Sequence, residues 1–61
     1  MSAQDMIKAL MAIGFTEEAI AYGVHAHKST ISRILRGKTN SPRYHLANEI
    51  RVIFEKYATM D

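Results

Sequence analysis

The sequence predicts an all-α protein, a single small domain of four to five helices that covers residues 1–61 and contains a helix-turn-helix. One observation is that apolar residues recur at helical spacing along most of the chain, with capping residues or glycines between the apolar segments. The other is the length. A chain of 61 residues forms one domain and buries only about 60% of its unfolded surface, so association with a partner subunit would add stability.

The first helix is expected to begin after Ser2, because a serine N-cap followed by Asp5 satisfies the first turn and complements the positive helix end. Gly14 supplies the left-handed residue that commonly ends a helix. The apolar face of this helix is expected to enter the core and comprises Met6, Ile7, Leu10, Met11 and Ile13.

A second helix is expected to begin at Glu17, because Thr16 is a good N-cap and acidic residues stabilise the first turn. Phe15 precedes the cap and is expected to pack near Ile20. We interpret Glu17 and Glu18 as charges that stabilise the helix start and not as a catalytic pair, since neighbouring helical residues point about 100° apart.

The turn after the second helix places His25 at the left-handed position that such turns usually give to glycine. Histidine tolerates this conformation at some energetic cost. A small residue, Ala21, allows the second and third helices to approach closely at a steep angle. Two apolar stripes face each other across the turn: Ile20, Ala21 and Val24 before it, and Ile31 and Ile34 after it.

A third helix is predicted from Lys28 to Leu35, with either His27 or Ser29 as its N-cap and Gly37 after its end. Beyond a polar loop, Ser41 and Pro42 are expected to start one long last helix of about 15 residues. Three apolar residues of this helix are expected to complete the core: Leu46, Ile50 and Ile53.

An apolar patch remains on the last helix. It comprises Val52, Phe54, Tyr57 and Met60. Such a patch is either loosely packed core or a two-fold dimer interface, and we favour the dimer interface.

The charges are sorted along the chain, although the net charge is only +2. All six acidic residues lie outside residues 19–48, whereas five of the eight Lys and Arg residues and all three histidines lie inside this window. A run of charge is usually just a solvated face, but here it coincides with the outward positions of the third helix, which favours a nucleic-acid partner. These outward residues are Lys28, Ser29, Ser32, Arg33 and Arg36.

Side-chain chemistry divides the expected DNA contacts. Arg33 can bond guanine O6 and N7 together and Lys28 can do so less directionally, while Ser29 and Ser32 suit either bases or phosphates. His27 is expected to face a phosphate or to cap the helix. Further contacts to the DNA backbone are expected from Arg36 and from four residues after the third helix: Lys38, Thr39, Asn40 and Arg43.

Several other classes of protein are not expected. The chain has no cysteine, and His25 and His27 lack the spacing of a helical zinc site, so we expect neither a metal nor another cofactor. We find no nucleophile–base pair and therefore expect neither an enzyme nor a small-molecule substrate. Without an apolar run of membrane length or a signal segment, no membrane partner is expected, and we expect a cytoplasmic location in a bacterial or phage-infected cell.

The segment from Glu17 to Tyr44 resembles, without a gap, the DNA-binding region of the lambdoid phage repressor and Cro family, particularly that of phage 434. The matching features are Ala21, Val24, Ile31, Ile34, the Gly37-Lys38-Thr39 triplet and Pro42-Arg43. The chain departs from the family at Glu17, where a phosphate-contacting glutamine is frequent, and at His25, where glycine is usual.

The resemblance implies a lambda-repressor-like helix-turn-helix fold, here with a longer last helix. It places Lys28, Ser29 and Arg33 at base-contacting positions. It places Arg36, Lys38, Asn40 and Arg43 at backbone or minor-groove positions.

We therefore expect a transcriptional repressor of the Cro type that binds a pseudo-palindromic operator in double-stranded DNA through the major groove, as a homodimer at least on DNA. The alternative is a small helical adaptor or anti-repressor whose basic face binds an acidic protein. Salt dependence and a response to DNA sequence separate the two.

Overall fold

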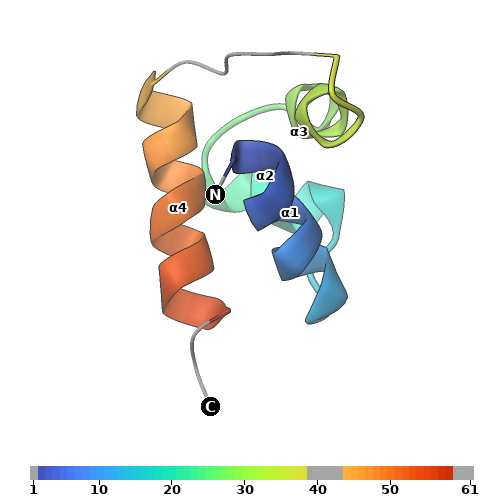
Figure 1. Cartoon of the computed structure of the whole chain (residues 1–61). Coiled ribbons are helices and arrows are strands. Elements are labelled where there is room, and N and C mark those ends of the chain that lie inside the picture. The colour runs from blue at the N-terminus through green and yellow to red at the C-terminus, as the bar shows by residue number, and fades with distance from the viewer. Residues whose placement is uncertain (1, 39–43, 59–61) are drawn as a thin grey trace.

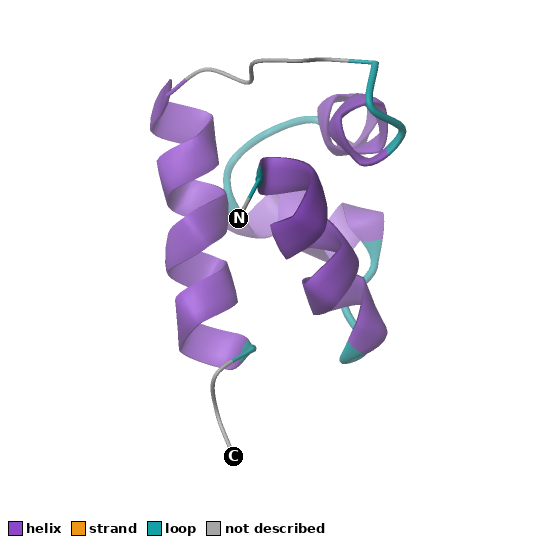
Figure 2. Ribbon diagram, viewed as in Figure 1, coloured by secondary structure: helices purple, strands orange, loops and turns teal. Residues whose placement is uncertain are grey.

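The computed structural model describes residues 2–38 and 44–58, and this part of the chain forms four helices (Figures 1 and 2). They are α1 (Ala3–Ala12), α2 (Glu17–Gly23), α3 (Lys28–Leu35) and α4 (Tyr44–Tyr57). No strand occurs among these residues, so the prediction of an all-α domain with a long last helix is confirmed. The predicted bounds of the third helix are those of α3.

Local hydrogen bonds explain where α1 and α2 begin. Ser2 Oγ accepts a bond from the backbone N–H of Asp5 at 3.1 Å, and Thr16 Oγ1 accepts one from the N–H of Ala19 at 3.0 Å. Both predicted N-caps are therefore confirmed. Of the two candidates for the N-cap of α3, the structure selects His27, whose side chain makes no capping bond.

The first three helices end in the same way, in a Schellman motif with a residue of positive φ after the cap. That residue is Gly14 after α1, His25 after α2 and Gly37 after α3, with φ values of 113°, 57° and 74°. The residue that follows donates its N–H back into the helix: Phe15 to the Leu10 carbonyl at 3.0 Å, Ala26 to Ala21 at 2.9 Å and Lys38 to Arg33 at 2.9 Å. The predicted left-handed position of His25 is confirmed.

The core contains residues from all four helices, and α1 packs against both α3 and α4. Its buried members are Met6, Ile7, Leu10, Ile20, Ala21, Val24, Ile31, Ile34 and Ile50. Ala21 is buried in α2, which packs against α3. Gly23 lies so close to α4 that an added Cβ would be 2.9 Å from Ile53 Cδ1.

The prediction that Ile13 enters the core is wrong. The side chain of Ile13 is 52% exposed, although it was expected to continue the apolar face of α1. The physical reason is that α1 ends at Ala12, so Ile13 is already the C-cap and the chain turns away through Gly14. Helical spacing does not apply beyond the end of the helix.

The last helix is single and contributes Ile50 to the core, with Leu46 and Ile53 packed against its edge as predicted. Its described part begins at Tyr44, and the predicted cap at Ser41 and Pro42 lies outside the described residues. None of the helices in the described residues has the length and apolar character that crossing a membrane requires.

α3 lies at the periphery of the molecule. In Figure 1 it is viewed nearly along its axis, whereas α4 is seen from the side on the opposite flank, so the two helix axes cross steeply. One side of α3 packs on α1 and α2, which leaves the other side open to solvent.

Candidate nucleic-acid interface

α3 has two chemically distinct sides because of its eight-residue sequence KSTISRIL. Ile31 and Ile34 are buried and fix the helix on the core. Ser29 and Arg33, four residues apart, lie on the opposite side and are exposed. The helix contains no acidic residue, so its solvent side carries only hydrogen-bonding and cationic groups.

Most of the predicted base-contacting residues lie together on this side. Lys28, Ser29 and Arg33 are exposed, and Ser32 is half-buried between them and the core. A hollow of about 210 Å³ is lined by Ser29, Ser32, Arg33, Arg36 and Lys38. The fold therefore brings two arginines, a lysine and two hydroxyl groups to one continuous surface.

The predicted phosphate-contacting residues fall into two groups. His27, Arg36 and Lys38 are exposed at the two ends of α3. The other three, Thr39, Asn40 and Arg43, lie outside the described residues. The Schellman motif at Gly37 holds Lys38 against the end of α3, since the N–H of Lys38 bonds the Arg33 carbonyl at 2.9 Å.

A glutamine of α1 fixes the C-terminal end of α3. Gln4 Nε2 donates a hydrogen bond to the backbone carbonyl of Leu35 at 2.8 Å, and 31 residues separate the two along the chain. The last carbonyls of a helix have no partner within it, so this bond satisfies one of them. Sequence spacing gave no indication of this contact because it joins distant segments.

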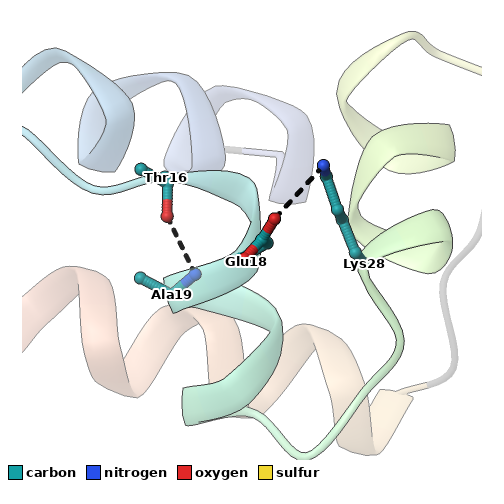
Figure 3. A network of polar contacts seen from close by, with 4 residues as sticks. All are labelled: Thr16, Glu18, Ala19 and Lys28. Carbon is teal, nitrogen blue, oxygen red and sulfur yellow. Dashed lines mark hydrogen bonds and ion pairs between the residues drawn. The ribbon is translucent and has the colours of Figure 1, made fainter.

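A second contact that the sequence did not indicate lies at the other end of α3. Lys28 Nζ is 3.4 Å from Glu18 Oε1 of α2, and the two side chains are 60% and 75% exposed (Figure 3). The interpretation of Glu18 as a charge that stabilises the start of α2 is therefore incomplete. No local spacing rule pairs residues ten apart across a turn, so only the packing of α2 on α3 indicates this ion pair.

The carboxylates of α2 and the solvent side of α3 border the same open hollow, of about 700 Å³. It is lined by Met11, Phe15, Thr16, Glu17, Glu18, Lys28, Ser29, Ser32 and Arg36. Among the described residues, Arg33 and Arg36 have no ion-pair partner, whereas Lys28 has one. The positive charge of this surface is therefore concentrated at the middle and the C-terminal end of α3.

The predicted dimer residues occupy different environments on α4. Val52 is 56% exposed, while Phe54 is half-buried and packs against the core of its own chain. Tyr57 is 40% exposed and its ring lies 5.2 Å from that of Phe15, centroid to centroid. Met60 lies outside the described residues. Among the described members of this set, the exposed side chains are therefore Val52 and Tyr57.

No protein-family model, curated protein or solved structure matches the chain. Across residues 2–38 and 44–58 the structure also holds no group of three His, Cys, Asp or Glu side chains that could bind a metal ion. We therefore infer the function from the geometry and charge of α3 and its neighbours.

Proposed function

We propose that this protein binds double-stranded DNA sequence-specifically, as a transcriptional repressor of the Cro type. In this proposal α2, the turn at His25 and α3 act as a helix-turn-helix, with α3 as the helix that enters the major groove. In this proposal the protein acts in the cytoplasm, is of the phage repressor and Cro class, and binds DNA as a homodimer.

The observation that carries the proposal is the sidedness of α3. Two buried isoleucines hold one side against the core, and the other side exposes Ser29, Arg33 and Arg36 with no acidic residue on the helix. A polyanion is the partner that such a surface fits. An α-helix fits the major groove of B-DNA, about 12 Å wide, and α3 lies at the edge of the molecule (Figure 2).

Base contacts in this proposal come from the solvent side of α3. Arg33 donates two hydrogen bonds to guanine O6 and N7, the commonest specific contact in protein–DNA complexes. Lys28 donates to the same acceptors of another guanine, and Ser29 and Ser32 bond base edges or nearby phosphates. These four residues determine the sequence of the half-site.

Phosphate contacts set the position of α3 in the groove. His27 and Arg36 flank the helix, and Lys38 follows Gly37 beyond its end, so in this proposal they reach the DNA backbone on both sides of the contacted bases. Thr39, Asn40 and Arg43 extend this set in the proposal. Contacts of this kind add affinity for every sequence and make binding depend on salt.

Dimerisation follows from the small footprint of one chain. An eight-residue helix is about 12 Å long and contacts only a few base pairs, so two copies on a pseudo-palindrome are needed for useful specificity. Val52 and Tyr57 supply exposed apolar surface for the contact between copies, with Phe54 and Met60 beside them in the sequence. Repression then results from occlusion of the operator.

The test is a selection of bound sites from random duplex DNA, followed by affinity measurements at several salt concentrations. We expect an enriched pseudo-palindrome with half-sites about 10 base pairs apart, and an affinity that falls by orders of magnitude between low and moderate salt. Arg51→Ala on α4 is the control, because it removes one positive charge away from α3. If no duplex binds at low salt, the proposal fails and the protein-binding adaptor replaces it.

A further inference from the structure

We propose that Glu18 is a specificity-determining residue, because its carboxylate keeps Lys28 from binding phosphates and leaves this lysine available for the edges of bases. This inference rests on the proposed function. The residue is not a base-contacting group in this proposal. It acts on the DNA sequence preference through Lys28.

The two groups lie at the N-terminal end of α3, beside the side of this helix that we propose contacts DNA. Glu18 Oε1 lies 3.4 Å from Lys28 Nζ, and Lys28 is the first residue of α3 (Figure 3). The N-terminal residues of such a helix contact base edges, while the neighbouring first helix lies across the DNA backbone. Glu18 and Lys28 also border the same open hollow as Ser29 and Arg36.

The pair is not explained by stability. Both side chains are mostly exposed, and an exposed ion pair contributes little to the free energy of unfolding because water screens it. A lysine at the first position of a helix is also unfavourable, since the positive end of the helix dipole repels it. Glu18 offsets that repulsion, but a neutral residue in place of Lys28 would avoid it altogether.

Electrostatics distinguishes the two kinds of DNA contact. A phosphate that approaches Lys28 also approaches the negative carboxylate of Glu18, so the attraction and the repulsion largely cancel. Guanine O6 and N7 carry no formal charge, and an ammonium group has more than one N–H donor, so Lys28 can bond a base edge while it stays paired with Glu18. The carboxylate therefore weakens the contact of Lys28 with phosphates, which are present in every DNA sequence. It does not weaken the contact with guanine, which is present only in the right sequence.

The chain provides a matched control in Glu17. It lies beside Glu18 in the first turn of α2, so Glu17→Ala and Glu18→Ala remove the same charge from the same helix end and add no hydrogen-bond donor. Among the described residues only Glu18 is paired with Lys28. A difference between the two variants therefore reports the ion pair and not the net charge of the protein.

The experiment measures the binding of the full chain to two duplexes of equal length, one with the selected site and one with the same bases in scrambled order. We expect Glu18→Ala to raise affinity for the scrambled duplex by about two- to fivefold, the range of an exposed ion pair, and to raise its salt slope by about one. Affinity for the selected site rises less, so the specificity ratio falls. Glu17→Ala raises both affinities alike and leaves the ratio unchanged.

A second pair of variants isolates the role of Lys28. With Lys28→Met in the background, Glu18→Ala is expected to behave as Glu17→Ala does, because no lysine remains to be released. Equal effects of Glu17→Ala and Glu18→Ala in the unaltered background would overturn the inference. If the two variants behave alike but the wild-type chain still binds the selected duplex more tightly than the scrambled one, only the role of Glu18 is refuted and the proposed function stands. If the wild-type chain binds both duplexes equally, the role of Glu18 and the proposed function both fail.

Discussion

α3 and α4 are both amphipathic helices on the same core, but their charges are arranged differently. On α4 two basic side chains have acidic partners one turn away: Arg51 Nε lies 3.6 Å from Glu55 Oε2, and His45 Nε2 lies 3.5 Å from Glu49 Oε1, a pair that is ionic when the imidazole is protonated. Lys56 Nζ lies 5.4 Å from the centroid of the Tyr57 ring. On α3 there is no acid, and its one ion pair reaches to another helix.

The difference indicates which helix projects an electric field into solvent. Opposite charges at i and i+4 largely cancel at a distance, so the ion pairs of α4 project little field into solvent. Arg33 of α3 and Arg36 at its C-cap have no ion-pair partner among the described residues, and they produce a field that attracts anions before contact. The two helices also differ in length, with 8 residues in α3 and 14 in α4, so α3 depends more on contacts at its ends.

The largest predicted effect concerns the attachment of each helix to the core. Ile31 of α3 and Ile50 of α4 are fully buried, so Ile31→Ala and Ile50→Ala should each lower the free energy of unfolding by about 2–5 kcal/mol. Urea denaturation followed by circular dichroism measures this. A loss below 1 kcal/mol for Ile31→Ala would mean that α3 is not held by this side chain.

The second prediction separates the two charged faces. Arg33→Ala is expected to weaken binding to the selected site by about 1–3 kcal/mol and to relax the base preference at one position. Arg51→Ala removes the same charge from α4 and is expected to leave the preference unchanged. Titration of labelled duplexes that vary at each position measures both. Equal losses for the two variants would contradict a special role for α3.

The third prediction concerns Lys38, which follows Gly37 beyond the C-terminal end of α3. Lys38→Ala is expected to weaken binding to every duplex alike and to lower the salt slope by about one, because it removes a phosphate contact. The measurement is the affinity at four or more salt concentrations for selected and scrambled duplexes. A loss confined to the selected duplex would make Lys38 a base-contacting residue.

The helices and the sidedness of α3 could be predicted because they depend on neighbours in the sequence. Thr16 caps α2, Gly37 ends α3, and the spacing of Ile31 and Ile34 fixes which side of α3 is buried. Even the strained position of His25 followed from the turn that it occupies.

The contacts that join separate segments could not be predicted in this way. Gln4 bonds the end of α3, and Glu18 pairs with Lys28, but neither pair has a characteristic spacing. Ile13 was placed in the core because periodicity alone does not reveal that α1 ends one residue earlier. These are effects of the tertiary arrangement.

The fourth prediction tests how the end of α3 is held. Gln4→Leu leaves the Leu35 carbonyl without its donor and should lower the free energy of unfolding by about 1 kcal/mol. Gln4→Lys is the control, because its ammonium group can donate to the same carbonyl at the negative end of the helix. Thermal and urea denaturation compare them. Equal stability of Gln4→Leu and wild type would show that solvent replaces the bond without cost.

The smallest predicted effect is a gain in stability at the turn between α2 and α3. His25 has a φ of 57°, a conformation that costs a residue with a Cβ about 1 kcal/mol or more, whereas glycine adopts it freely. After subtraction of the greater chain entropy of glycine, His25→Gly should raise the free energy of unfolding by about 0.5 kcal/mol. His25→Ala keeps the strain and should give no gain. Because His25 is outside the proposed DNA contacts, the affinity of His25→Gly for the selected site should not change, and a loss of affinity would place this turn in the interface.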